Sequence, residues 1–434
     1  MDYFSADRLY GIVRSAFSTI KSQTGKKPFY SSSDVLMSGL AIFSQKYPSL
    51  LAFEKDLEPS KPLFHNLQKL MGIEKIPSDT QMRERIDRIE NKELRKPFQI
   101  IHNELEKSGV YKSFQFKGKC LLAIDGTGYF SSNAVSCPHC MVKKSKTNGT
   151  VYQHLALGIV MVHPDHKQVL PLAPEFISNE DGRSKNDCER NAAKRLLAKT
   201  RDDFPDLEMV VVEDGLSSNA PHIASLIEYK MGFILGAKPG DHKFLFKNIE
   251  IARENGSLDC FVLNKNNVKY EFEMLSQTQL NASTDLLVNF LSVKVHGKNG
   301  RITVFSWITD QTLDRETCFD IMRMGRSRWK IENETFNTLK NQGYNFEHNY
   351  GHGVQHLCNN FGSLMFLQFL IDQVMELTWS LFHDVRTAQG PRYAIWESIR
   401  SIFSLVKLKD WTELFNIAAY KISMHVEGSN KNTC

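Results

Sequence analysis

The sequence lacks any long uninterrupted hydrophobic run. No segment reaches the roughly 18 consecutive apolar residues that mark a candidate membrane-spanning helix. The closest stretch, residues 361–382, is interrupted on one side by polar residues: Gln368, Asp372, Gln373 and Glu376. We therefore expect a buried amphipathic helix there and no membrane association. The polar start of the chain, Met1 to Arg8, also has no signal-peptide pattern.

Cysteine is scarce, and so is any excess of charge. Eight cysteines are mostly scattered through 434 residues, which argues against a disulfide framework and predicts reduced thiols in the cytoplasm. The net charge of +5 permits a nucleic-acid partner without requiring one. No internal repeat or low-complexity tract is present. The length therefore predicts a soluble globular protein of two or three domains with a large core.

The pattern of apolar residues changes along the chain. Residues 1–112 have helical spacing, and Ser78-Asp79-Thr80 form a polar cap before a helical run that starts at Gln81. This helical domain carries basic residues such as Arg83, which either lie on solvated helix faces or contact DNA.

Strand-like runs alternate with helical segments over residues 113–257, which predicts an α/β layer with a partly parallel sheet. Residues 258–312 read as a β-rich insertion. Helices return over residues 313–427, and residues 428–434 form a short tail.

Two predicted strands end in an acid followed by glycine. Asp125-Gly126 follows one apolar run, and Asp214-Gly215 follows another. Either pair alone is common as a simple turn. Acids at the carboxyl ends of strands in an α/β sheet also lie where such folds place their ligands.

A predicted helix over residues 328–340 places Glu332 among cations. The basic residues around it are Arg323, Arg326, Arg328, Lys330 and Lys340. Trp329 in the same segment is more often a core residue than a stacking platform for a DNA base. Carboxylates are preferred ligands of Mg²⁺, and two ions roughly 4 Å apart can promote phosphoryl displacement. The cations would neutralise backbone phosphates.

The order Asp125…Asp214…Glu332, with a β-rich insertion before the last acid, resembles the DDE transposases of bacterial insertion sequences. The resemblance covers about residues 75–375 and extends through these segments: Ile124–Gly128, Asn186–Arg190, Val212–Gly215, Asn219–His222, Gly236–His242, Arg328–Glu332 and Gly343–Gly353.

The resemblance implies a ribonuclease H-like core, a mixed sheet flanked by helices, with an N-terminal helical domain and C-terminal helices. It implies Mg²⁺ or Mn²⁺ held by Asp125, Asp214 and Glu332. The substrates would be double-stranded DNA at the transposon ends and in the target. The protein would act as a homo-oligomer on paired DNA ends in the bacterial nucleoid.

The sequence departs from the family's helix pattern at two positions. Many relatives carry Tyr, Arg, Glu and Lys at fixed steps, whereas this chain has Gly325 and Leu339 at the Tyr and Lys positions. Lys340 is one residue late, and Glu334 is a weaker rival to Glu332. Two other functions remain open: a DNA-binding protein of transposase descent without activity, and a ribonuclease H-like nuclease acting on another substrate.

Three further motifs carry weaker signals. Cys137 and Cys140 could form a zinc site with His163 and His166, or could be unliganded or redox-active thiols. The segments at Lys238 and at His348-Asn349 follow a strand and the acidic helix. Each is either a plain turn or a contact to DNA.

Overall fold

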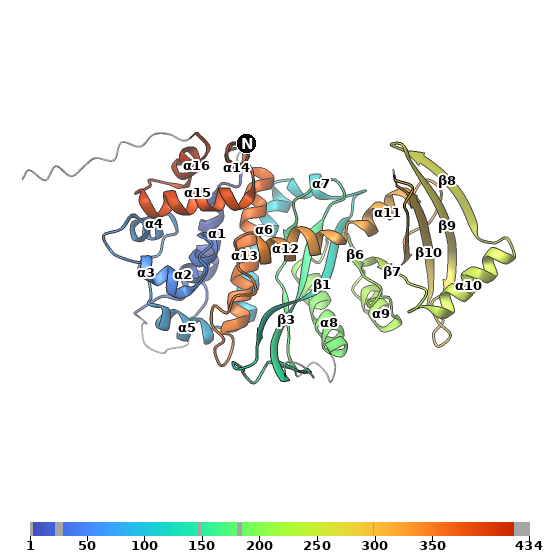
Figure 1. The fold of residues 1–434 in the computed structure, drawn as a ribbon, viewed down its shortest axis with the longest axis horizontal. Coiled ribbons are helices and arrows are strands. Elements are labelled where there is room, and N and C mark those ends of the chain that lie inside the picture. The colour runs from blue at the N-terminus through green and yellow to red at the C-terminus, as the bar shows by residue number, and fades with distance from the viewer. Residues whose placement is uncertain (1–2, 22–28, 146–148, 180–184, 298, 421–434) are drawn as a thin grey trace, which may run out of the picture.

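The computed structural model describes residues 3–21, 29–145, 149–179, 185–297 and 299–420, so the predicted tail at 428–434 lies outside the described residues. Its architecture is mixed α/β, with one large mixed sheet flanked by helices (Figure 1). Helices from both ends of the chain gather at one end of the molecule, and the last strands of the sheet lie at the other.

The described residues up to Phe114 form short helices, four of which begin at serine caps. Ser5, Ser31, Ser49 and Ser78 each accept a backbone N–H of the first helical turn. The helices are α1 (Ala6–Ser18), α2 (Ser32–Ser44), α3 (Leu50–Asp56), α4 (Pro62–Leu70), α5 (Asp79–Asp87), the 3₁₀-helix η1 (Asn91–Leu94), α6 (Arg95–Lys107) and α7 (Val110–Phe114).

The centre of the sheet combines parallel and antiparallel strands. Strand β1 pairs in parallel with β6, and β6 with β7, whereas β3 runs antiparallel to β1. The elements of this part are β1 (Cys120–Ser132), β2 (Met141–Ser145), β3 (Gly149–Val162), β4 (Leu170–Pro171), β5 (Glu175–Ile177), α8 (Lys185–Asp203), β6 (Met209–Glu213), α9 (Ala220–Glu228), β7 (Gly232–Gly236) and α10 (Lys243–Glu254).

The predicted β-rich segment extends this same sheet. Its strands are all antiparallel, and the last of them pairs with β7, giving the order β2-β3-β1-β6-β7-β11-β10-β9-β8. The strands are β8 (Asp259–Lys265), β9 (Val268–Gln279), β10 (Leu287–His296) and β11 (Ile302–Thr309).

The C-terminal third is helical. The helices are α11 (Cys318–Arg326), the π-helix η3 (Ile331–Phe336), α12 (Asn337–Asn341), α13 (Leu357–Thr378), α14 (Ser380–Gln389), α15 (Arg392–Leu405) and α16 (Trp411–Tyr420). The single helix predicted over residues 328–340 is therefore wrong in detail, because its acidic part winds as a π-helix. Such turns are rare and are frequent at functional sites.

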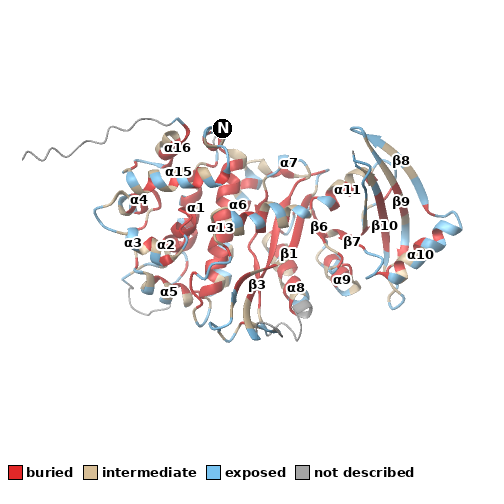
Figure 2. Cartoon of the chain, in the orientation of Figure 1, coloured by how far each residue is buried: buried red, intermediate tan, exposed pale blue. Residues whose placement is uncertain are grey.

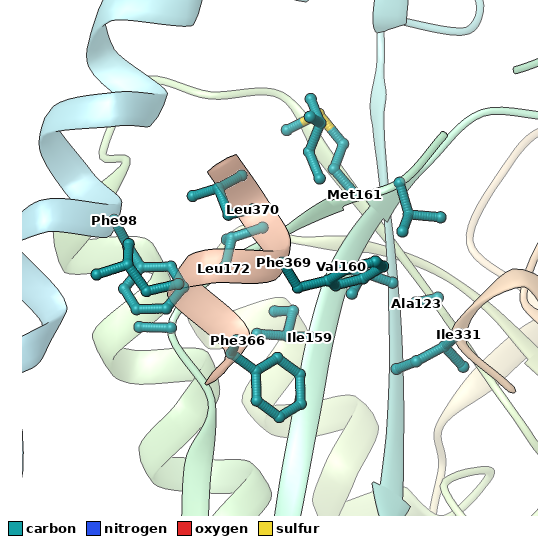
Figure 3. Close-up of a cluster of buried hydrophobic side chains, with 14 of the residues drawn as sticks. Phe98, Ala123, Ile159, Val160, Met161, Leu172, Ile331, Phe366, Phe369 and Leu370 are labelled. Atoms are coloured by element: carbon teal, nitrogen blue, oxygen red, sulfur yellow. The ribbon is translucent and has the colours of Figure 1, made fainter. Parts of the chain in front are cut away.

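Helix α13 is buried almost throughout its length (Figure 2). The sequence predicted a polar face, but its polar side chains lie inside the protein with partners. Asp372 pairs with the buried Lys46 at 2.7 Å, and Glu376 binds Arg392. Helices α6 and α13 pack through Phe98, Phe366 and Phe369 beside β3, and Ile331 of η3 reaches Ala123 of β1 (Figure 3). No helix in the described ranges is long and apolar enough to cross a membrane.

Candidate functional site

Asp125 and Asp214 occupy matching positions on neighbouring parallel strands. The last parallel pair between β1 and β6 is Ala123 with Val212, and each aspartate follows two residues later. Strand β1 does not end at Asp125 as predicted, since it continues to Ser132 in antiparallel pairing with β3. The aspartates nevertheless meet where the parallel pairing stops.

A glycine lets the acidic π-helix approach β1 and β3. Gly158 is the register partner of Asp125. A Cβ atom at Gly158 would lie 2.9 Å from the ring of Phe336 and 3.7 Å from Ile331. The helix η3 therefore packs directly on the backbone of Gly158, through the buried side chains of Ile331 and Phe336.

The three predicted acids interact electrostatically. Burial raises the pKa of Asp125 to about 6, and the negative charges of Glu332 and Asp214 add to this rise. The backbone N–H of Gly126 and the Arg328 guanidinium act against it. Chain segments far apart in sequence thus place their carboxylates within electrostatic reach of one another.

Arg328 lies between two of these acids. Its Nη1 atom is 2.7 Å from Oε1 of Glu332 and 3.4 Å from Oδ2 of Asp125. The Arg328 side chain is only 14% exposed, so it acts as an internal counter-ion. Among the described residues, the acids do not form a closed set of metal ligands.

The structure separates Glu332 from Glu334. Glu334 faces away from Asp125, and its Oε2 atom lies 3.8 Å from Nη1 of the buried Arg392. The two side chains are two residues apart on one helix and therefore point in nearly opposite directions. Only Glu332 joins the aspartates.

A cavity beside the aspartates contains acids that the sequence reasoning missed. Glu213, buried next to Asp214, pairs with His222 at 2.5 Å, and this pairing raises the pKa of His222 against the effect of burial. Glu189 of α8 packs against Gly126, where a Cβ would lie 2.8 Å from its Oε1 atom. Both acids line the cavity with Asp125 and Asp214. The pattern Val212-Glu-Asp214 carried a signal for Glu213, whereas nothing in the sequence marks Glu189.

Several predicted phosphate-binding cations already have partners. The ammonium of Lys330 donates to the carbonyls of His163 and His166. Arg323 pairs with Asp165, and Lys340 pairs with Glu347 at 2.8 Å. These contacts give Lys330 and Arg323 a structural role in fastening the segment around η3 to the turn after β3.

Other predicted DNA-contacting residues are accessible. Trp329 is 54% exposed, so the more common interpretation as a core residue is wrong. Arg326 and Lys238 are also exposed.

The predicted contacts at the other end of the acidic segment include a charge pair. Arg83 is bound to Asp79 at 2.5 Å. The side chains of His348 and Asn349 reach solvent, although the imidazole of His348 is partly desolvated by its neighbours. This partial desolvation, together with the charge of Arg83, lowers the pKa of His348.

The departures from the family's helix pattern have a steric basis. A Cβ at Gly325 would lie 2.6 Å from the indole nitrogen of Trp307, so a tyrosine does not fit there. Leu339 is fully buried, so a charged side chain at that position would be costly without a buried partner.

A second cluster lies on the same sheet. Cys137 and Cys140 follow β1, His154 lies on β3, and His352 belongs to the segment between α12 and α13. Their four ligand atoms lie within 4.8 Å of one another. Burial raises the pKa of Cys140 to about 11 and lowers the pKa of His154 to about 4.

The predicted pairing of these cysteines with His163 and His166 is wrong. His163 follows β3 nine residues after His154, roughly 30 Å away in an extended strand at about 3.3 Å per residue. It packs instead against Phe114 and Phe116, and His166 stacks on Phe114. The sequence could not identify His352, which is 212 residues from Cys140.

No protein-family model matches this chain. No curated protein matches it either.

Proposed function

We propose that this protein is a DDE transposase, which cuts DNA at the ends of a transposable element and joins them to target DNA. The observation that carries this proposal is the convergence of the three acids: Asp125 and Asp214 each follow the last parallel pair of β1 and β6 by two residues, and Arg328 bridges Asp125 to Glu332. A mixed sheet flanked by helices, with the aspartates on adjacent parallel strands, supports the finer assignment of a ribonuclease H-like core.

The donor set suits Mg²⁺ or Mn²⁺. Carboxylate oxygens are the ligands that these ions prefer, and a cationic group, Arg328, already lies between Asp125 and Glu332. Such ions would activate water or a 3′-hydroxyl and stabilise the leaving oxygen. Asp125, Asp214 and Glu332 would hold them, and Arg328 would turn from its acids toward a backbone phosphate.

The DNA would approach across the exposed surface of the segment that leads from α11 into the π-helix. Trp329 and Arg326 are accessible in this segment and could contact a base and a phosphate. The cations that are bound to carbonyls or acids contribute less to this surface.

The test is Mn²⁺-dependent cleavage of double-stranded DNA that carries the sequences flanking the coding region. Asp125→Asn and Asp214→Asn should each reduce cleavage by about 10³-fold or more, the effect of removing one member of a catalytic set. DNA binding, measured by fluorescence anisotropy, should persist. Asp206→Asn, at an exposed loop aspartate, is the matched control and should cleave normally.

Two other results would replace the proposal. An absence of Mn²⁺-dependent cleavage by the unaltered protein, with DNA binding intact, would indicate an inactive DNA-binding relative. In a strand-transfer assay with pre-cut ends, release of fragments without any joining to target DNA would indicate a ribonuclease H-like nuclease with a different substrate.

A further inference from the structure

The Cys137, Cys140, His154 and His352 side chains present their ligand atoms in a tight group. Cys137 Sγ and Cys140 Sγ are 3.8 Å apart, and the Nε2 atoms of His154 and His352 are 3.4 Å apart. Three of the four sulfur-to-nitrogen distances are 3.3 to 3.4 Å. The fourth, between Cys137 and His352, is no more than 4.8 Å.

These distances match a tetrahedral zinc site. With Zn–S near 2.3 Å and Zn–N near 2.05 Å, tetrahedral geometry requires about 3.8 Å between sulfurs, about 3.4 Å between nitrogens and about 3.6 Å between unlike atoms. The observed sulfur and nitrogen pairs agree with these values, and the three short mixed pairs agree to within about 0.3 Å. One ion therefore fits among the four ligand atoms with a small shift of Cys137 or His352.

The alternative of a redox-active cysteine pair explains less. The sulfurs lie 3.8 Å apart, far from the ~2.05 Å of a disulfide bond. Cys140 is 1% exposed, which hinders exchange with another thiol. A redox pair would also leave unexplained why two imidazoles direct Nε2 atoms at the same point. Thiolate and imidazole ligands select zinc over Mg²⁺.

We propose that a structural Zn²⁺ binds Cys137, Cys140, His154 and His352 and fastens the segment after the acidic helix to the sheet. Three ligands belong to the β1–β3 region, and His352 alone comes from the connection between α12 and α13. All four coordination positions are filled by protein, as in structural rather than catalytic zinc sites.

The same connection is held on its other side by the N-terminal helices. Asp87 of α5 accepts backbone N–H groups from residues 354 to 357 at 2.8 to 3.0 Å. Gly353 makes this approach possible, since its φ is +67° and a Cβ there would lie 2.4 Å from Asp87 Oδ1. The zinc ion thus completes a two-sided attachment that joins the sheet, the acidic helix and α5.

The first experiment measures zinc in the purified full-length protein by plasma mass spectrometry. We expect one Zn²⁺ per chain, with loss of the ion in Cys137→Ser and in His352→Asn. Cys260→Ser, at an exposed cysteine, and His166→Asn, at the rejected partner, are matched controls that should retain it. Zinc absent from the unaltered protein, or retained in His352→Asn, would overturn the assignment.

Cobalt substitution keeps the test valid if a variant folds poorly. Co²⁺ in the unaltered protein should give the visible absorption of a tetrahedral site and thiolate charge-transfer bands. His352→Cys should still bind one ion, with stronger charge-transfer absorption from a third thiolate. An octahedral spectrum, or no spectrum, would contradict the proposed ligand set.

Limited proteolysis tests the fastening role. Removal of zinc by a chelator should expose residues 342–356 to cleavage, and added Zn²⁺ should restore protection. Equal cleavage with and without zinc would contradict this role. None of these readouts involves DNA cleavage, so the zinc site and the proposed transposase activity stand or fall separately.

Discussion

The acidic site and the cysteine–histidine cluster lie on the same sheet but differ in how complete they are. The cluster is closed: its four ligand atoms lie within 4.8 Å of one another, and two of its members, Cys140 and His154, are buried. The acidic site is open, with Glu332 43% exposed and Arg328 neutralising two acids. A structural centre can be formed by the fold alone, whereas a catalytic centre must leave room for its substrate.

This difference also appears in the backbone. The acidic segment η3 winds as a π-helix. This form is rare, and it would relax to an ordinary α-helix unless packing held it. Phe336 packs on Gly158, and the ammonium of Lys330 donates hydrogen bonds to three backbone carbonyls. These contacts supply that restraint. The fold thus stabilises the position of Glu332 from outside the site, and leaves its carboxylate accessible.

The sharpest test of the open site compares its two glutamates. Glu332→Gln should reduce Mn²⁺-dependent DNA cleavage by about 10²–10³-fold, because it removes a negative ligand oxygen beside Asp125. Glu334→Gln should leave the rate within about twofold, since Glu334 faces Arg392 and a group outside the reacting set changes the barrier by about 0.5 kcal/mol or less. Single-turnover cleavage rates on the same DNA measure both.

The control for this comparison is folding. Both variants should show the thermal unfolding midpoint of the unaltered protein to within a few degrees, because neither carboxylate is a buried member of the core. Equal losses of cleavage in the two variants would mean that the π-helix as a whole, rather than Glu332, is required.

Sequence reasoning found the elements of this site better than the contacts between them. Asp125, Asp214 and Glu332 could be selected because each ends or begins a recognisable local pattern, and the structure brings all three within electrostatic reach. The packing of η3 on Gly158 could not be predicted, because it depends on the register between β1 and β3. His352 could not be assigned to the cysteines, because no local spacing connects residues 212 positions apart.

Most of the predicted cations have partners within the fold. The sequence placed Arg323, Arg328, Lys330 and Lys340 around one acidic position and predicted phosphate contacts for all of them. In the fold, each one meets a carboxylate or a carbonyl. Charge clustering along a chain therefore predicts polar contacts but does not say whether the partner is a ligand or another part of the protein.

A second, smaller effect separates an open acidic site from a structural ion pair. In the metal-free protein the pKa of Asp125 is about 6, above its ordinary value of 3.8, so the folded state binds more protons than the unfolded state between these values. Stability should therefore fall as pH rises from about 4 to 6. Asp125→Asn should remove this loss and raise the free energy of unfolding at pH 7 by about 1–3 kcal/mol.

Urea unfolding of chelator-treated protein at pH 4.5 and pH 7 measures this effect. Asp206→Asn, at an exposed aspartate, should keep the pH dependence of the unaltered protein. A destabilised Asp125→Asn protein at pH 7 would show that Asp125 serves mainly as the partner of Arg328. The acidic site would then stabilise the fold, as the cysteine–histidine cluster does.

The smallest effect concerns the surface that leads to the open site and has no counterpart at the closed cluster. Trp329 is 54% exposed, so Trp329→Ala should change the free energy of unfolding by only about 0.5 kcal/mol. If the indole stacks on a base, the same change should weaken DNA binding by about 1–2 kcal/mol, or roughly 5- to 30-fold. Trp329→Phe should recover most of the affinity, because stacking needs an aromatic face and not the indole N–H.

Trp396→Phe, at a buried tryptophan, provides the opposite pattern, with lower stability and unchanged DNA binding. Fluorescence anisotropy at fixed salt, together with thermal unfolding, distinguishes the two residues. Equal DNA affinity of Trp329→Ala and the unaltered protein would show that DNA does not contact the surface around Trp329 on its way to the acidic site.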